Sequence, residues 1–192
     1  MEKAAIKAAD ENLARATPAR QAMENAQKLS EIETAWSDFL TAANRIFSKL
    51  EQGAKVSGKS NSWYGRKKHE RSTSPLLSYI HHARNADEHG IARVTEKTGA
   101  GLALGVGPGA WRFDGTFGPG GTMKVTALGG QVPGESKFVE VIPSKVRLVA
   151  VIDRGVKYEP PIGPNSAELT PIEVANTALV QLKSLIEDAE QL

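Results

Sequence analysis

Apolar side chains recur at intervals of three and four positions in two long stretches of this chain. Residues 30 to 51 carry one such stripe, which includes Trp36 and Phe39, and a second stripe starts at Thr170 and includes Leu182. This spacing is that of one face of an α-helix. The two stretches therefore predict amphipathic helices that share a core, and Trp36 and Phe39 are expected there rather than in a ligand-binding cage.

Short polar motifs predict the ends of these two helices. Ser30 and Glu33 have the spacing of a capping box, as do Thr170 and Glu173. In such a box a hydroxyl and a carboxylate each accept a backbone N–H at the start of the helix. Gly53 is expected to stop the first helix, because glycine is the usual residue just beyond a helix C-terminus.

Composition and proline predict two more helices. Residues 2 to 28 are rich in Ala, Glu, Lys and Gln, which favour helix. Pro18 is expected to break or kink this helix, with Thr17 as a cap. Ser74 followed by Pro75 predicts the start of another helix that continues to about position 90.

Between Ile91 and Pro161 the pattern changes to glycine-rich segments and short alternating runs, which predict β-strands. The predicted strands are residues 111–114, 123–125, 138–142, 146–152 and 156–158. Asp153-Arg154-Gly155 is expected to form the turn between the last two. The glycine-rich run 99–109 lacks the Gly-Lys-Ser/Thr of a phosphate-binding loop, so we interpret it as a connection or tight bend.

These elements predict an α+β fold. The 192 residues suit one domain that carries an insertion. We expect an up-and-down bundle of about four helices from residues 1–90 and 165–192. A small antiparallel β insertion, residues 91–164, is expected between the third and fourth helices.

Composition limits the kinds of chemistry and the location that we expect. The chain has no cysteine, its first residues lack the apolar core of a signal peptide, and no stretch is apolar for long enough to span a bilayer. We therefore expect a cytoplasmic protein without membrane insertion. No nucleotide fingerprint, serine-hydrolase elbow or cysteine nucleophile is present, and we expect no cofactor.

The net charge is only +2, but positive charge is concentrated between Lys55 and Arg71, where six basic residues face one acid, Glu70. Basic and aromatic side chains interleaved in a flexible segment can bind a phosphate backbone and stack on a base. Within a predicted loop of residues 53–73, the side chains expected to contact RNA are Lys59, Trp63, Tyr64, Arg66, Lys67, Lys68 and Arg71. The alternative is a solvated connector between helices.

Candidate chemistry is concentrated on the last turns of the third predicted helix, where Arg84, Asn85 and His89 follow one another. An arginine binds a phosphate through a two-pronged hydrogen-bonded fork, and a histidine exchanges a proton near neutral pH. Residues five apart project about 140° apart on an ideal helix. Arg84 and His89 would therefore meet only if the helix ends between them or if two copies of the chain face each other.

An ordinary structural interpretation exists for the same residues. His89 can interact with the last carbonyls of its helix, and Arg84 can pair with Asp87 or Glu88 one turn away. The adjacent His81 and His82 point about 100° apart on a helix, so one shared site for both is not expected. A histidine pair spaced for zinc is missing, and we expect no metal site.

The run Arg84-Asn85-Ala86-Asp87-Glu88-His89 resembles the signature of the HEPN superfamily, in which an arginine and a polar residue precede a histidine by four to six intervening positions. The predicted helices resemble that family's bundle, whereas the β insertion departs from it. The resemblance implies a metal-independent ribonuclease that acts as a homodimer, often as a toxin or in phage defence. It implies that Arg84 binds the scissile phosphate, that His89 is the general acid or base, and that Asn85 orients the phosphate or the imidazole.

The alternative hypothesis is a non-catalytic interaction module. The resemblance also covers family members that do not cleave RNA. In that case the helices would form a dimer, and the β insertion would bind a protein partner, such as a cognate antitoxin, or nucleic acid. A buried ion pair between Arg84 and Asp87 or Glu88 would favour this alternative, and a cleft with basic surroundings would favour catalysis.

Overall fold

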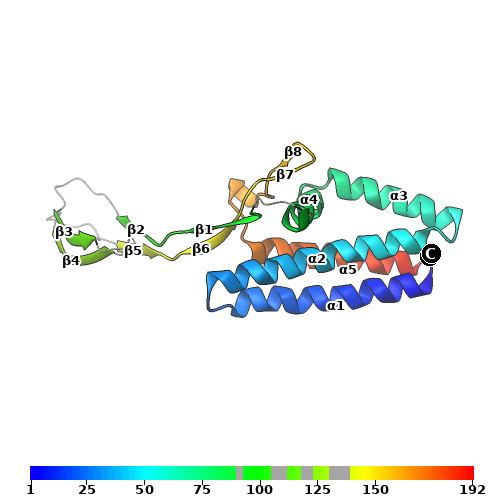
Figure 1. Cartoon of the computed structure of the whole chain (residues 1–192), viewed down its shortest axis with the longest axis horizontal. Helices are drawn as coiled ribbons and strands as arrows, with labels where there is room; N and C mark the ends of the chain where they lie inside the picture. Colours follow the sequence, from blue (N-terminus) through cyan, green and yellow to red (C-terminus); the bar gives the residue numbers. More distant parts are fainter. Residues whose placement is uncertain (90–92, 105–111, 118–122, 130–138) are drawn as a thin grey trace. The chain divides into compact units, whose positions relative to one another are not determined.

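The computed structural model describes residues 1–89, 93–104, 112–117, 123–129 and 139–192, and it describes their side chains except those of His89, Asn165 and residues 101–142. Within these ranges the chain has an α+β fold that is mostly a helical bundle (Figure 1). The helices are α1 (Lys3–Asn25), α2 (Leu29–Ala54), α3 (Gly58–Thr73), α4 (Pro75–His89) and α5 (Pro171–Glu190), and the short 3-10 helix η1 is Pro164–Ser166.

The chain divides into two compact units. The helical unit comprises Met1–Thr98 and Lys145–Leu192, and the strand unit comprises Gly99–Ser144. The sequence predicts one insertion that comprises all of residues 91–164. In the structure both ends of that segment belong to the helical unit. Near its start Thr95 donates to Glu33 of α2, and near its end residues 145–148 contact α2 and α5 while the hairpin of residues 151–158 contacts α4.

Helices α1, α2 and α5 form the centre of the helical unit, where α1 and α2 lie side by side along their length (Figure 1). Trp36 and Phe39 are fully buried between the helices, and their rings stack with centroids 5.6 Å apart. From α5, Leu182 joins the same core. The prediction that these apolar stripes share a core is therefore confirmed. Among the described residues, no helix combines the length and apolar character needed to cross a bilayer.

Gly53 lies inside the last turn of α2 rather than just beyond its end, so the predicted stop signal is wrong. Gly53 instead lets α2 approach α1 closely. A Cβ atom at Gly53 would lie 2.2 Å from the Cβ of Ala5 on α1, a separation that real Cβ atoms do not reach. The alanine-rich face of α1 and this glycine allow the two helix backbones to pack closely.

One of the two predicted capping boxes is found in the structure. At α5 the capping box is confirmed, since the Thr170 side chain accepts from the backbone N–H of Glu173. At α2 the box that the sequence suggested, Ser30 with Glu33, is wrong. The helix begins two residues earlier, and Glu31 accepts from the backbone of residues 27 and 28.

Helix α1 continues through Pro18, so the expected break is also wrong. The Thr17 hydroxyl does not cap a new helix but donates to the carbonyl of Leu13 one turn earlier.

Helix α3 replaces the loop predicted for residues 53–73. The Ser57 hydroxyl caps its first turn by accepting from the N–H of Ser60. Ser60, Trp63 and Tyr64 are buried against the bundle, at the spacing of one helix face. Tertiary burial of this narrow stripe outweighs the low helix preference of a glycine- and serine-rich sequence.

Within the residues that the structure describes, the strands form four antiparallel pairs. In the helical unit β1 (Thr95–Thr98) pairs with β6 (Lys145–Leu148), and β7 (Val151–Asp153) pairs with β8 (Val156–Tyr158). In the strand unit β2 (Gly101–Leu104) pairs with β5 (Val139–Ile142), and β3 (Arg112–Phe117) pairs with β4 (Met123–Gly129). The stretch predicted as one strand, residues 146–152, contributes to both β6 and β7. Much of the glycine-rich run, residues 105–109, lies outside the described residues.

The β7–β8 hairpin has the turn that the sequence predicted. Arg154 and Gly155 occupy its two central positions with φ of +53° and +79°. Positive φ at both positions defines the type I′ turn, whose twist matches that of paired strands. The turn places Asp153 and Arg154 beside α4, which contacts both strands of the hairpin.

Candidate functional site

A polar groove lies along α4 in the helical unit. Its volume is about 530 Å³. The side chains that line it come from α2, α4 and the β7–β8 hairpin, and they are Asn44, His81, His82, Arg84, Asn85, Asp153 and Arg154. Two guanidinium groups and two imidazoles in one groove can bind an anion such as phosphate and exchange protons with it.

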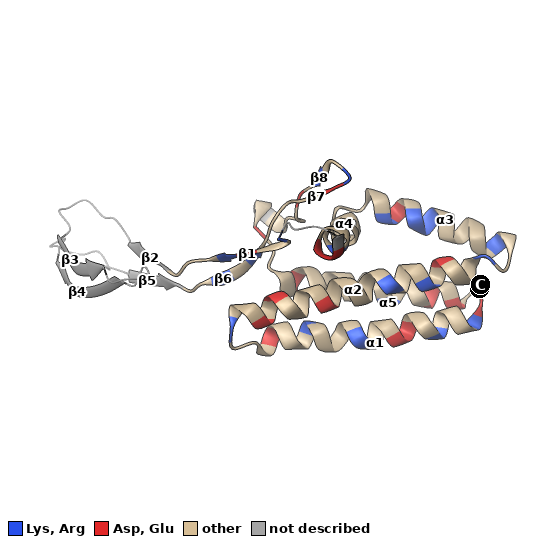
Figure 2. Cartoon of the chain, in the orientation of Figure 1, with Lys and Arg blue, Asp and Glu red and all other residues tan. Residues whose placement is uncertain are grey.

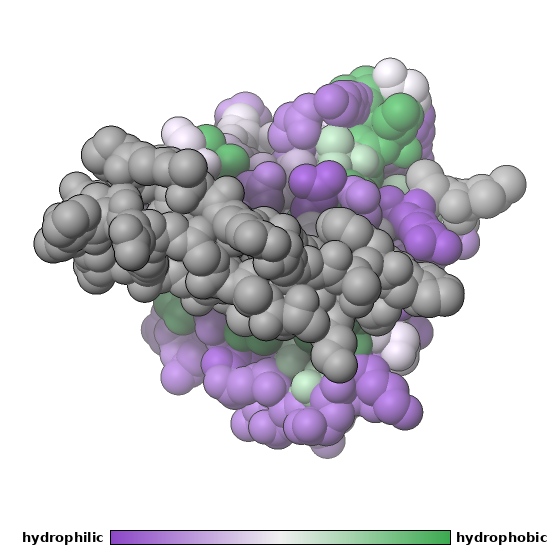
Figure 3. Space-filling model, turned by 90° about the vertical axis from the view of Figure 1, so that its left-hand side faces the viewer, coloured by the Kyte–Doolittle hydropathy of each residue, from purple (hydrophilic) through white to green (hydrophobic). Residues whose placement is uncertain are grey.

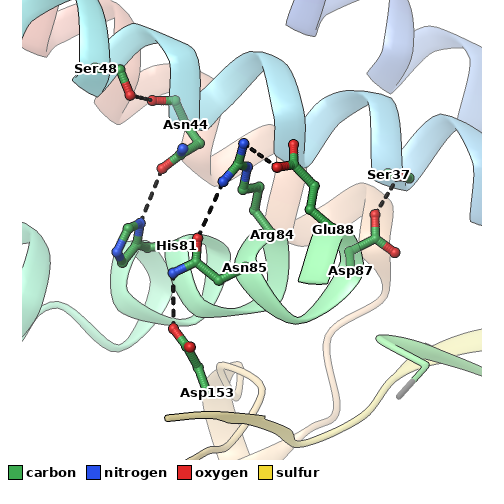
Figure 4. A network of polar contacts seen from close by, with 9 residues as sticks. All are labelled: Ser37, Asn44, Ser48, His81, Arg84, Asn85, Asp87, Glu88 and Asp153. Atoms are coloured by element: carbon green, nitrogen blue, oxygen red, sulfur yellow. Dashed lines mark hydrogen bonds and ion pairs between the residues drawn. The ribbon is translucent and has the colours of Figure 1, made fainter. Parts of the chain in front are cut away.

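Arg84 is held by its neighbours on α4. Its Nη2 forms an ion pair with Glu88, and its Nη1 donates to the Asn85 carbonyl oxygen at 3.5 Å (Figure 4). Asp87, the other acid considered as a partner, instead accepts from the Ser37 hydroxyl on α2. The Arg84 Nε is buried without a hydrogen-bond partner among the described residues, which is uncommon for a buried polar atom.

His81 faces α2 across the groove. Its Nδ1 lies 3.0 Å from the Oδ1 of Asn44. Because this oxygen only accepts, Nδ1 carries the proton and Nε2 keeps a lone pair in the neutral ring. Burial, reinforced by the nearby positive charge of Arg71, lowers the pKa of His81 to about 4. The ring is therefore neutral at neutral pH.

His82 faces the hairpin. Its Nδ1 lies 2.7 Å from the Oδ2 of Asp153, and its ring stacks on Tyr158 with centroids 3.5 Å apart. The same Asp153 oxygen accepts from the Asn85 amide at 2.9 Å (Figure 4). The hydrogen bonds from Asn85 and His82, in that order, lower the pKa of Asp153. This carboxylate therefore remains ionised well below neutral pH.

Both histidines border one groove, although their positions on a helix made a shared site unexpected. Their rings lie with centroids 4.9 Å apart. The groove wraps around α4 from α2 to the hairpin, so residues that point in different directions from the helix still reach it. The two rings thus point to different partners, Asn44 and Asp153, and still line one groove.

His89 is the last residue of α4, and its side chain lies outside the described residues. The helix does not end between Arg84 and His89. The arrangement in which the helix ends between them is therefore not found, and the meeting of two chains stays a prediction.

The two aromatic residues expected to stack on RNA bases are in the core. Trp63 and Tyr64 are buried, with exposed fractions of 6 % and 4 %. The Tyr64 hydroxyl donates to the carbonyl of Phe47, and burial raises the pKa of Tyr64 to about 12. Neither ring presents a face to a base, so this part of the RNA-binding prediction is corrected.

The cations predicted to bind RNA lie along α3 (Figure 2). They differ in whether they already have a partner within the chain. Lys67 pairs with Asp188 and Glu70, at 2.9 and 3.1 Å, and Lys68 pairs with Glu51 at 3.4 Å. Arg71 stacks over the Phe47 ring at 4.7 Å. Lys59 and Arg66 are exposed and form no ion pair with the residues that the structure describes. The basic surface is therefore smaller than the sequence implied.

The groove contains residues that the sequence analysis did not select, namely Asn44, Asp153 and Arg154. Asp153 lies 68 positions from Asn85 in the chain, so no local pattern connects them. The sequence did indicate part of the groove, because His81, Arg84 and Asn85 have the spacing of one helix face. No three described His, Asp or Glu side chains gather in a group that could hold a metal ion.

The fold and groove define an α+β protein whose helical bundle carries a polar, histidine- and arginine-lined site. Comparisons with protein families, with curated proteins and with solved structures find no match to this chain.

Proposed function

We propose that the groove beside α4 binds RNA and cleaves it without a metal ion, as the HEPN-like motif implies. The observation that carries this proposal is that the Arg84 guanidinium shares one polar groove with the imidazoles of His81 and His82. Cleavage of a phosphodiester by its own 2′-hydroxyl needs a cation for the phosphate and groups that transfer protons. The groove offers both kinds of group.

In this mechanism Arg84 binds the scissile phosphate, and Asn85 orients the guanidinium through its carbonyl oxygen. His89 takes the proton of the 2′-hydroxyl, as the motif implies. Glu88 competes with the phosphate for the Arg84 guanidinium, and their ion pair is only partly buried, with side chains that are 24 % and 33 % exposed. A phosphate that accepts two hydrogen bonds from the guanidinium can displace it.

The proposal includes a homodimer, since Arg84 and His89 diverge on one helix and would meet across two chains. Lys59 and Arg66 are exposed on α3 and would contact the RNA backbone. Such an enzyme would act on cytoplasmic RNA, as a toxin or in phage defence, and a protein antitoxin would be a partner.

A second candidate is the non-catalytic interaction module. It is favoured by the ion pair of Arg84 with Glu88, where the Arg84 side chain is only 24 % exposed. Hydrophobic surface also gathers in the upper part of the face shown in Figure 3. Ile152, Val156 and Ile162 are large hydrophobic residues that are exposed in the helical unit, and a partner could cover them.

Incubation of the purified protein with cellular RNA and EDTA tests the proposal. We expect wild type to cleave and to leave 2′,3′-cyclic phosphate ends, and we expect Arg84→Ala and His89→Ala to lose about 100-fold or more of the rate, the usual scale for such groups. Arg15→Ala and His69→Ala are matched controls, because both side chains are exposed outside the groove. A folded wild-type protein without cleavage would favour the interaction module.

The same assay tests the dimer. A mixture of Arg84→Ala and His89→Ala chains forms heterodimers with one intact site, so mixing should restore part of the activity. Cleavage by His89→Ala at the wild-type rate would remove His89 from the mechanism. Absence of restoration would contradict a site shared between chains.

A further inference from the structure

The imidazole of His82 is fixed from two sides by the β7–β8 hairpin. Asp153 at the end of β7 accepts from its Nδ1 at 2.7 Å, and Tyr158 at the end of β8 stacks on its ring at an angle of 12°. Asp153 is itself held by the Asn85 amide. A ring with one bonded nitrogen and one covered face has a single orientation in the groove.

This arrangement also fixes the tautomer. An ionised carboxylate can only accept hydrogen bonds, so Nδ1 of His82 carries a proton. Nε2 is then the nitrogen that remains for a substrate, and it carries a second proton when the ring is charged. The Asp153 carboxylate at Nδ1 and the stacked Tyr158 ring hold Nε2 in a fixed direction in the groove.

We propose that His82 is the general acid of the cleavage reaction and that Asp153 is its positioning residue. This inference rests on the proposed function. In the reaction the 2′-oxygen bonds to phosphorus while its proton passes to the base. The bond from phosphorus to the 5′-oxygen breaks, and that oxygen takes the proton from Nε2 of His82. The products are a 2′,3′-cyclic phosphate and a 5′-hydroxyl.

The charged neighbours of His82 suit this role. Asp153 and Arg154 face it from the hairpin, and His81 and Arg84 flank it on α4, all at the same groove. His81 is neutral at neutral pH, so the nearest charged partner of His82 is the Asp153 carboxylate. A phosphate bound at Arg84 would lie in the groove that His82 also lines.

The ordinary alternative is that His82 and Asp153 only attach the hairpin to α4. A substrate whose leaving 5′-oxygen is replaced by sulfur separates the two roles, because a thiolate leaves without needing a proton. The variant His82→Asn can keep an N–H near the position of Nδ1 for Asp153 while removing Nε2. His82→Gln is the second variant should His82→Asn not fold, and thermal unfolding checks each protein.

We expect His82→Asn to cleave normal RNA about 100-fold or more slowly, the usual contribution of a general acid. Asp153→Asn is expected to lose about tenfold, since it acts through His82. With the sulfur substrate both variants should approach the wild-type rate, whereas Arg84→Ala should stay slow. His69→Asn and Asp10→Asn are matched controls, because these side chains are exposed and lie outside the groove.

The outcomes separate this inference from the proposed function. If wild type cleaves and Arg84→Ala does not, but His82→Asn cleaves normal RNA at the wild-type rate, only the role of His82 is overturned. A folded His82 variant that loses both substrates equally would show a structural role and would also overturn it. If wild type cleaves neither substrate, the proposed function fails and this inference fails with it.

Discussion

The buried imidazole of His81 links the stability of the fold to pH. Burial and the charge of Arg71 lower its pKa to about 4 in the folded chain, below the ordinary value of about 6.5 that applies when the chain is unfolded. Between these values the unfolded chain binds more protons than the folded chain. The contribution of His81 to stability is therefore complete above about pH 6.5 and is lost as the pH falls toward 4.

We expect the free energy of unfolding to fall by about 1 kcal/mol more in wild type than in His81→Asn between about pH 7 and pH 5, after discounting for the partial exposure of the ring to solvent. Urea denaturation at both pH values measures this difference. Asparagine removes the titration but can still donate toward Asn44. His69→Asn, at an exposed position, should keep the wild-type pH dependence. Equal pH slopes for wild type and His81→Asn would contradict the burial of an uncharged ring.

The contact between α1 and α2 depends on the absence of a side chain at Gly53. Because a Cβ there would lie 2.2 Å from the Cβ of Ala5, Gly53→Ala must move one helix backbone. We expect a loss of about 1–3 kcal/mol in the free energy of unfolding, the usual cost of overpacking. Gly65→Ala is the matched control, since a Cβ at that helical position has no neighbour within 4 Å. It should gain about 0.5–1 kcal/mol from helix preference.

Urea denaturation of both alanine variants tests the packing of these elements. A Gly53→Ala protein that is as stable as Gly65→Ala would show that the two helices are not held at this separation.

The elements that the sequence predicted well are those with wide apolar faces. Helix α2 and helix α5 bury such faces, so their local spacing carries the tertiary information. Helix α3 was missed because its buried stripe holds only Trp63 and Tyr64 among polar residues. Pro18 was expected to break or kink α1, and the helix does not break, because a helix that is packed along its length can include proline at the cost of one hydrogen bond.

In the candidate site too, the sequence predicted only those residues that lie together on one helix. Arg84 and Asn85 were found because their chemistry is local to one helix. Asn44 and Asp153 come from other elements, and only the packed structure brings them to His81 and His82. The turn at Arg154 was predicted from its residues, but nothing local indicates that this hairpin packs on α4.

At the scale of the whole molecule, we predict that the helical unit folds without the strand unit. Thr98 at the end of β1 lies directly opposite Lys145 at the start of β6. A two-residue Asn-Gly turn can join strands at such a position, because it adopts the type I′ conformation. We expect a chain in which this turn replaces Gly99–Ser144 to unfold in one cooperative transition, since the helices and strands of the helical unit share one hydrophobic core.

Thermal unfolding and RNA cleavage by this shortened chain should both match wild type, because every residue assigned to the groove belongs to the helical unit. A longer Gly-Ser linker at the same position serves as the control for strain in the turn. If both shortened chains fold but cleave slowly, the strand unit contributes contacts to the substrate. If neither folds, the helical unit depends on the strand unit, and the division at Thr98 and Lys145 does not separate independent folding units.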